Sequence, residues 1–194
     1  MTDSPDLAPW RVLDRRQVFS GGPIREIAVE TVELPDGRII PDYYRIELPD
    51  YVLIFAELAD GTVPLLRQYK HGLGRVCLGF PGGALESGET PLAAARRELR
   101  EELGCVADEW ESLGSFVTNA NQRCNTAHFY RATAVRRVAE PDSGDLEDAV
   151  VVYLERTALL TRERLEDIGQ AAHVALLLLA CSRIECPASS PSPR

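Results

Sequence analysis

The first half of the chain alternates apolar and polar positions with the two-residue period of β-strands. Ile27, Val29 and Thr31 follow this alternation in the first such segment, which ends at the turn sequence PDG. The segment YYRIEL follows the turn, and the same arrangement returns where an apolar run over 52–58 meets a turn at ADG and a second run reaches Tyr69. We therefore predict consecutive β-hairpins and a first half that is mostly strand.

The pattern changes to a helical period at Thr90. Its hydroxyl suits an N-cap, Pro91 suits the first helical position, and Gly104 stands where a helix C-cap belongs. Between these limits an apolar residue recurs every three or four positions, for example at Leu99 and Leu103. These signals predict a helix between Thr90 and Gly104 with one apolar stripe.

Three strands and two helices are predicted after this helix. The segments ESLGSFVT, AHFYRATAV and AVVVYLE have strand character, and the acidic, turn-rich segment PDSGDLED precedes the last of them. A helix around 161–167 and another over roughly 171–184 follow, and the tail PASSPSPR has the composition of a disordered segment. We predict an α/β protein with a mixed sheet, divided into an N-terminal β-rich extension at 1–48, a domain at 49–186 and a disordered tail at 187–194.

Composition limits the classes of partner. The chain has 194 residues, of which 45% are hydrophobic and 26% charged, as in an ordinary soluble domain. Its net charge of −9 and the absence of a Lys/Arg-rich run argue against a nucleic-acid polymer or an anionic membrane. The five scattered cysteines contain no CxxC pair, which argues against a zinc site and a disulfide framework. With no signal peptide visible, we expect a cytoplasmic protein.

Three glutamates of the predicted helix share one face. Glu98, Glu101 and Glu102 stand at i, i+3 and i+4, where like charges repel and modestly destabilise a helix. A divalent cation would reverse this effect, because Mg²⁺ binds carboxylate oxygens together with substrate phosphate and water. Arg97 is also placed to pair with Glu89 across the preceding loop. From the residues alone, a metal–phosphate site and a solvated charged face both remain open.

The spacing of these residues resembles the Nudix box, G-x5-E-x7-R-E-U-x-E-E-x-G-U, in which U is a bulky aliphatic residue. All of its fixed letters are present, at Gly83, Glu89, Arg97, Glu98, Glu101, Glu102 and Gly104. Leu99 fills the first U position, and the small apolar Cys105 stands at the second. A chance match of so many letters is rare at ordinary residue frequencies, and the chain is therefore similar to the Nudix hydrolases.

This resemblance implies the Nudix α/β/α sandwich, with the box forming a loop, a helix and a second loop. It implies attack of water on a phosphorus of a nucleoside diphosphate derivative, with Mg²⁺ as cofactor and Mn²⁺ as a possible substitute. The family's metal ligands would be the carboxylates of Glu98, Glu101 and Glu102 with the backbone carbonyl of Gly82, and Glu101 is also a catalytic candidate. The implied structural residues of the box are Gly83, Glu89, Arg97 and Gly104.

Similarity to ADP-ribose pyrophosphatases and related nucleoside-diphosphate-sugar hydrolases extends over most of residues 17–184, through LPDG, RQYK, FPGG and GDLEDAVVVYL. In that subfamily an acidic loop supplies a catalytic base or a further metal ligand. This implies catalytic roles for Asp145 and Glu147, with Glu147 also a metal ligand, although both would be idle in a merely solvated turn. The candidate substrate contacts are Arg67, Lys70, Asn121 and Arg123.

Two departures from the subfamily leave the substrate open. Gly79 stands where ADP-ribose enzymes commonly have a glutamate, and NANQ stands where they tend to have a proline. We predict cleavage of an ADP-ribose-like compound or nucleotide sugar to a nucleoside monophosphate and a sugar phosphate. The alternatives are another nucleoside diphosphate derivative, such as a dinucleoside polyphosphate or modified nucleotide, and a non-catalytic ligand-sensing domain.

The remaining expectations concern assembly and the other reactive side chains. The resemblance implies a homodimer in which the N-terminal strands take part. An isoprenoid-diphosphate isomerase of this fold would need a cysteine–glutamate pair, and the surroundings of Cys77 and Cys124 do not match it. We expect His128 and His173 to be structural histidines rather than catalytic ones.

Overall fold

The computed structural model describes residues 8–142 and 149–182, which fall into two compact units. The first unit takes in the chain up to Pro49 together with Val117–Thr126. The second takes in Asp50–Phe116 and the chain from Ala127 onward. The domain limits predicted from the sequence stay predictions, and the proposed disordered tail lies outside the residues described.

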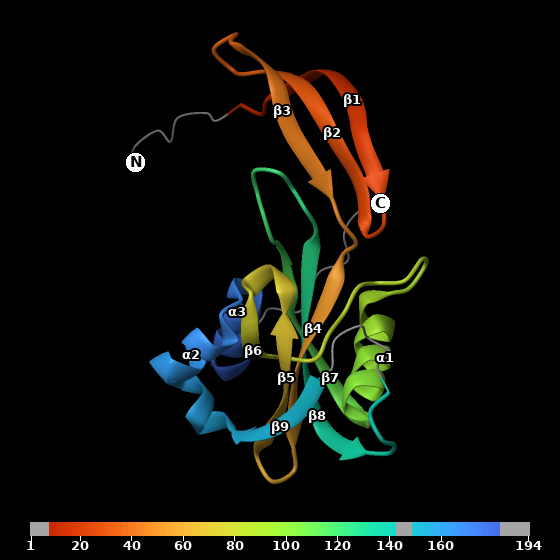
Figure 1. Cartoon of the computed structure of the whole chain (residues 1–194), viewed down its shortest axis with the longest axis vertical. Helices are drawn as coiled ribbons and strands as arrows, with labels where there is room; N and C mark the ends of the chain where they lie inside the picture. The colour runs from red at the N-terminus through yellow and green to blue at the C-terminus, as the bar shows by residue number, and fades with distance from the viewer. Residues whose placement is uncertain (1–7, 143–148, 183–194) are drawn as a thin grey trace, which may run out of the picture. The chain divides into compact units, whose positions relative to one another are not determined.

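Strands dominate the first half of the chain, as predicted, and helices are concentrated after residue 90 (Figure 1). The strands are β1 (Arg11–Gly21), β2 (Ile24–Glu33), β3 (Ile39–Glu47), β4 (Tyr51–Leu58), β5 (Thr62–Lys70), β6 (Arg75–Gly79), β7 (Cys105–Val117), β8 (Thr126–Arg137) and β9 (Ala149–Glu155). The helices are α1 (Pro91–Leu103), α2 (Arg162–Ile168) and α3 (Ala171–Cys181), with the 3₁₀ turns η1 (His71–Leu73) and η2 (Arg156–Leu160).

The first unit is built on an antiparallel sheet in the order β1-β2-β3. β2 alternates as its sequence predicts, with Ala28, Glu30 and Val32 buried on one side. Glu30 is buried as a charged group because the guanidinium of Arg15 pairs with it at 2.9 Å. The loop at 117–126 joins this unit through hydrogen bonds between its carbonyls and the amides of β3 and the residues after it.

β1 is an element that the sequence analysis did not predict. All of its residues are exposed, so no burial pattern marks it. Its pairing with β2 has register shifts between Val12 and Asp14 and again between Gln17 and Phe19. Each bulge adds a residue to one strand and breaks the two-residue period, which is the signal that sequence analysis relies on.

The second unit is a three-layer α/β/α sandwich, which confirms the predicted fold class. β4 supplies both faces of the central layer, because its side chains alternate. Val52 and Ile54 pack with the apolar stripe of α1, whereas Leu53 and Phe55 pack with α2 and α3. The central layer contains two three-stranded sheets, in the orders β4-β8-β7 and β6-β5-β9. β4 pairs with β8 in parallel in the first sheet, whereas β5 pairs with β6 and β9 in the antiparallel sense in the second, so the two kinds of pairing occur in different sheets.

The predicted limits of α1 are confirmed in atomic detail. The Thr90 hydroxyl accepts from the Ala93 amide at 3.3 Å, and Pro91 is the first helical residue. Gly104 adopts the left-handed conformation with φ of 63° and donates its amide to the Arg100 carbonyl. α3 ends slightly earlier than predicted, at Cys181. In the portion of the chain that the structure describes, no helix has the length and apolarity needed to cross a membrane.

Candidate active site

The glycine-rich segment before α1 runs beside β4 as a short extra strand. The amide of Ile54 donates to the Pro81 carbonyl and that of Val52 donates to the Gly83 carbonyl, both at 2.9 Å. Successive carbonyls of an extended segment point in opposite directions. The carbonyl of Gly82 lies between these two and is therefore directed away from β4. It points toward the edge of the segment that faces the carboxylates of α1.

Gly82 and Gly83 are required here by close approach. A Cβ atom on Gly82 would lie 2.1 Å from the carbonyl oxygen of Val52, which is backbone and cannot move aside. A Cβ on Gly83 would lie 2.2 Å from Oε1 of Glu98. The absence of side chains thus lets β4 approach one side of the segment and a carboxylate of α1 approach the other.

We expect Gly83→Ala to displace the Glu98 carboxylate while leaving the sandwich folded. Steady-state hydrolysis by this variant should fall by about 100-fold, because a displacement of about 1 Å at a reacting centre has an effect of this size. Gly88→Ala, where a Cβ would meet nothing within 4 Å but the backbone φ of 80° disfavours alanine, serves as the control for general strain. Equal losses of activity in the two variants would contradict the expectation.

The three predicted metal-binding glutamates differ in burial. Glu98 and Glu102 are each 8% exposed and flank the buried stripe of α1, whereas the side chain of Glu101 is 41% exposed. Glu102 is fixed by a hydrogen bond in which the amide of Gly82 donates to its Oε2 at 2.7 Å. Two carboxylates are therefore held against the glycine segment, with a third at the surface beside them.

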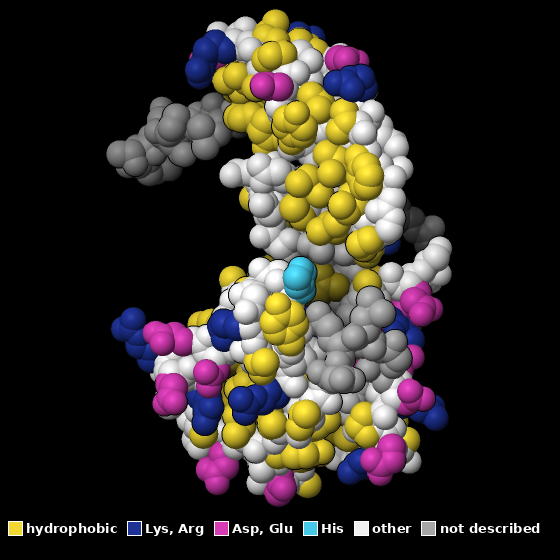
Figure 2. Space-filling model, in the orientation of Figure 1, with side chains coloured by type: hydrophobic (Ala, Val, Ile, Leu, Met, Phe, Trp, Pro, Cys, Tyr) yellow, Lys and Arg dark blue, Asp and Glu magenta, His cyan; other side chains and the backbone are white. Residues whose placement is uncertain are grey.

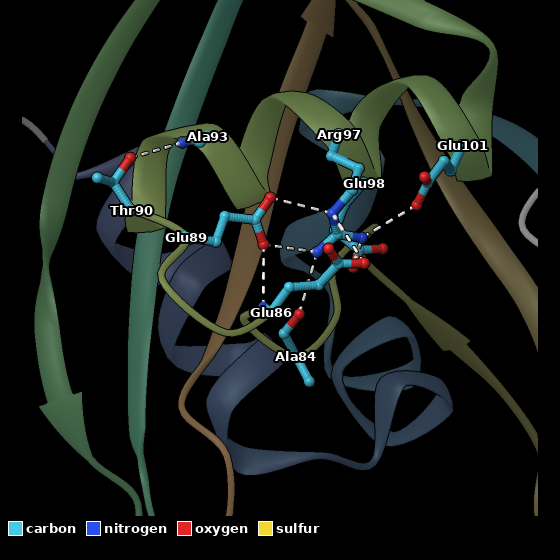
Figure 3. A network of polar contacts seen from close by, with 8 residues as sticks. All are labelled: Ala84, Glu86, Glu89, Thr90, Ala93, Arg97, Glu98 and Glu101. Atoms are coloured by element: carbon cyan, nitrogen blue, oxygen red, sulfur yellow. Dashed lines mark hydrogen bonds and ion pairs between the residues drawn. The ribbon is translucent and has the colours of Figure 1, made fainter.

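Arg97 links the loop to these glutamates (Figure 3). Its Nε and Nη2 donate to the two carboxylate oxygens of Glu89 at 3.1 and 3.0 Å, which confirms the predicted pair. Its Nη1 donates to Glu98 at 2.7 Å and to Glu101 at 3.0 Å, and Nη2 also donates to the carbonyl of Ala84 at 3.1 Å. The hydrogen bonds from Arg97 hold the pKa of Glu89 below its ordinary value. A single guanidinium thus orients the loop and two of the candidate ligands.

The cluster has an excess of negative charge that suits a hard cation. Arg97 faces four carboxylates, those of Glu86, Glu89, Glu98 and Glu101. A fifth, that of Glu102, lies against the Gly82 amide. Carboxylate oxygens and a backbone carbonyl are the donors that Mg²⁺ binds in proteins. Across residues 8–142 and 149–182, no three His, Cys, Asp or Glu side chains already converge in the geometry of a metal site. The donor types fit the cation, and Arg97 is the counter-ion in the structure described here.

Comparison with known families agrees with this arrangement. Residues 47–174 match the NUDIX domain, and residues 10–46 match the nucleoside diphosphate sugar hydrolase N-terminal domain. The first of these matches covers more than half of the chain. The chain belongs to the Nudix family. The predictions of a Nudix hydrolase and of an enzyme that acts on phosphorus-containing anhydrides are thereby confirmed at the level of the family.

Individual relatives of this Nudix protein include an ADP-ribose pyrophosphatase of Bacillus subtilis, 29% identical over 79% of this chain and 84% of its own length. A methanol dehydrogenase activator of Bacillus methanolicus is 31% identical over 76% of this chain and 78% of its own length. A crystal structure of an ADP compounds hydrolase shares the fold with a TM-score of 0.79, at 23% identity over 91% of this chain and 95% of that one.

The structure brings the box residues together but distributes the predicted substrate contacts. Arg67 lies on β5 and lines a cavity of about 270 Å³ whose other lining residues belong to β6 and α2, not to the box. Lys70 ends β5. Asn121 and Arg123 belong to the first unit, where Arg123 has a positive φ of 49°. Asp145 and Glu147 lie outside the described residues.

Two features near the candidate site were not predicted from the sequence. Arg96 and Arg100 line a groove along α1 together with Glu101, and only their four-residue spacing could have indicated it. The second feature is the chain after β8, which wraps the C-terminal end of α1. The amides of Val138 and Ala139 donate to the Gly104 carbonyl, and that of Asp142 donates to the Glu101 carbonyl at 2.7 Å. The acidic segment therefore begins with a hydrogen bond to the backbone of Glu101, which is a candidate metal ligand.

His173 of α3 holds the other end of the glycine segment. The amide of Phe80 donates to its Nδ1 at 2.9 Å, and the imidazole is 8% exposed. Burial, with a smaller contribution from the positive charge of Lys70, lowers the pKa of His173 to about 4. His128, by contrast, is half-buried on β8 and lies 2.8 Å from the Ser115 hydroxyl. Both contacts suit the structural roles that we predicted for these histidines.

The depressed pKa of His173 predicts a stability that falls in acid. At pH values between the ordinary histidine pKa of 6.5 and the native value of about 4, His173 is protonated in the unfolded chain but stays neutral in the native protein. The free energy of unfolding should therefore decrease as pH falls through this window, by up to roughly 3 kcal/mol from this group. Urea titrations near pH 7 and near pH 5 should show a shallower pH dependence in His173→Leu than in the wild type. Equal slopes would contradict the assignment.

Proposed function

We propose that this Nudix protein hydrolyses the pyrophosphate bond of a nucleoside diphosphate sugar, with Mg²⁺, to a nucleoside monophosphate and a sugar phosphate. The observation that carries the proposal is the pair Glu98 and Glu102, held against the Gly82–Gly83 backbone in a cluster with excess negative charge. The names of the Bacillus subtilis relative and of an ADP-sugar pyrophosphatase of Mus musculus, 34% identical over 59% of this chain and 54% of its own length, support this substrate class.

The residues of the chain divide the work of this reaction. A bound divalent ion would neutralise phosphate oxygens and lower the pKa of the attacking water. Glu98, Glu102 and the Gly82 carbonyl would hold it, and Arg97 orients Glu98 by a direct hydrogen bond. Glu101 is the most exposed of the three glutamates and is the candidate to accept a proton from the water. Asp145 and Glu147, outside the described residues, stay alternative candidates for this role.

Substrate recognition would fall to cationic and amide side chains outside the box. Arg67 and Lys70 are candidates for contacts with the diphosphate, because both carry positive charge on β5. Asn121 and Arg123 are candidates for selectivity. A reducing compartment such as the cytoplasm suits the four cysteines in the described ranges, which are all free thiols.

The proposal is tested by measuring hydrolysis of ADP-ribose, other nucleotide sugars and dinucleoside polyphosphates in the presence of Mg²⁺. We expect turnover of a nucleotide sugar, loss of turnover on chelation, and restoration by added Mg²⁺ or Mn²⁺. Isotopically labelled water should place its oxygen in a product phosphate, since the attack is on phosphorus. Binding of a nucleotide sugar without turnover would instead indicate a sensor domain, and turnover only of another class would replace the substrate assignment.

We further propose that the protein is a homodimer formed through the sheet of the first unit. β1 exposes Val12, Val18 and Phe19, and β3 exposes Ile39 and Tyr44, each at least 42% exposed. Figure 2 shows hydrophobic side chains gathered over this sheet. A three-stranded sheet with so much apolar surface gains stability when a second copy covers it.

Phe19→Glu should weaken this dimer. A charged side chain at an apolar interface raises the dissociation constant by about 30-fold or more, which sedimentation equilibrium measures directly. Leu178→Glu, at an apolar residue of α3 that is 50% exposed in the second unit, is the matched control and should leave the mass unchanged. A monomeric wild type at micromolar concentration would contradict the proposal.

A further inference from the structure

The segment from Phe80 to Gly83 is held on both edges by different means. β4 amides donate to the carbonyls of Pro81 and Gly83 on one edge. On the other edge, the Phe80 amide donates to His173 at 2.9 Å and the Gly82 amide donates to Glu102 at 2.7 Å. Groups two residues apart on one edge of a strand normally pair with a neighbouring strand. Here two side chains from two helices supply the acceptors instead.

We propose that His173 is a positioning residue for the metal site, acting through the Phe80 amide to set the place of the Gly82 carbonyl. The inference rests on the proposed function, since it assumes that Gly82 and the box glutamates hold the cation. It adds that the helix α3, which carries no box residue, controls the geometry of the ligand set. His173 itself would touch neither the cation nor the substrate.

The imidazole is well placed for this role because its surroundings fix it. Its ring stacks on that of Phe80, with centroids 6.2 Å apart and an interplanar angle of 23°. Gly79 leaves room for it, since a Cβ there would lie 3.3 Å from its Cε1. Leu176 and Leu177, on the following turn of α3, are fully buried in the core shared with Phe80. The position of α3 is therefore transmitted to the Phe80 peptide by one rigid side chain.

The hydrogen bond also fixes the tautomer. Because Nδ1 accepts from the backbone amide, the neutral imidazole carries its proton on Nε2. A side chain without an acceptor would leave the buried Phe80 amide unpaired, and such an amide moves to find a partner. Gly82 lies two residues away with both of its peptide groups in the same extended segment. Loss of outer contacts of this kind lowers metal affinity or activity by about 10- to 100-fold.

A matched pair of variants isolates the acceptor. His173→Asn retains an oxygen near the position of Nδ1, whereas His173→Leu has nearly the same shape and no acceptor. His173→Phe keeps the ring volume without the acceptor and replaces the leucine variant should that one fail to fold. Amide hydrogen exchange of the peptide spanning Leu78–Ala84 and Mn²⁺ binding without substrate are measured for each folded variant, alongside kcat and KM.

We expect His173→Leu and His173→Phe to lose protection in this peptide and to bind Mn²⁺ about 10-fold more weakly, with kcat lowered and KM little changed. His173→Asn should recover most of the protection and affinity. His128→Leu, which removes a half-buried histidine bonded only to a hydroxyl in the described contacts, is the control and should leave Mn²⁺ binding unchanged.

Lost protection with unaltered Mn²⁺ affinity would overturn the inference, because the amide would then be uncoupled from the metal site. Retained protection in the variants without an acceptor would overturn it as well, and so would failure of His173→Asn to recover affinity. Absence of Mn²⁺ binding in the wild type is a separate result, which would count against the proposed metal site itself.

Discussion

Glu102→Gln should lower kcat by about 1,000-fold while the protein stays folded. The amide oxygen of glutamine can still accept the hydrogen bond from Gly82, so the local fold keeps its anchor. The negative charge is lost, however, and with it the attraction for a divalent cation. Mn²⁺ binding in the absence of substrate should weaken in parallel.

The matched control is Glu163→Gln, at an exposed position in the first turn of α2. This variant also removes one negative charge, but at a position distant in sequence from the Nudix box. It should leave kcat and Mn²⁺ binding unchanged. Near-wild-type activity of Glu102→Gln at saturating Mg²⁺ would refute the assignment of this residue as a ligand. Thermal unfolding of both variants shows whether a loss of activity is a loss of fold.

Arg97→Ala should have the second large effect, on stability as well as on turnover. It removes five hydrogen bonds, among them those to Glu89 and Glu98, whose side chains are 13% and 11% exposed. Removing one partner of a largely buried ion pair costs about 3 kcal/mol of unfolding free energy. The corresponding fall in Tm is roughly 6 to 12 °C, and turnover should fall at least about 100-fold.

Two further variants define what Arg97 contributes. Arg97→Lys keeps the charge but cannot bond both oxygens of Glu89 together, so it should recover only part of the stability. Arg162→Ala breaks an ion pair with Glu166 whose side chains are 93% and 69% exposed, and should change stability by less than about 0.5 kcal/mol. Equal losses for Arg97→Ala and Arg162→Ala would contradict the role of Arg97.

The same pair predicts a dependence on pH. Arg97 lowers the pKa of Glu89 in the native state, so the pair stabilises the fold above the ordinary glutamate pKa. This contribution is lost as pH falls through the lowered native value. The acid side of the stability profile should therefore be less steep in Arg97→Ala than in the wild type.

The sequence predicted α1 to the residue because its limits are local. Thr90, Pro91 and Gly104 act on neighbouring backbone groups, and these signals are independent of the rest of the fold. β1 was missed for the opposite reason. Its bulges remove the periodic signal, and its pairing with β2 is visible only once both strands are in place.

The site was predicted in part. Spacing correctly identified the pair of Arg97 with Glu89, because both belong to one loop and helix. It treated the three metal-candidate glutamates as equivalent, whereas Glu98 and Glu102 flank the buried stripe and Glu101 is turned toward solvent. The contact from His173 to Phe80 joins residues 93 positions apart, and no local pattern could have indicated it.

The alternation of side chains along β4 determines which kinds of mutation this strand can accept during evolution. A substitution at Val52 or Leu53 disturbs one packed cluster, because the two side chains enter different cores. Deletion of a single residue would do more, since it would turn the amides of Val52 and Ile54 away from the carbonyls of Pro81 and Gly83. Both faces of the shifted strand would still be apolar, so the chain could remain compact after the Pro81–Gly83 segment had lost its hydrogen bonds to β4. Over evolutionary time β4 should therefore accept changes of side chain far more readily than changes of length.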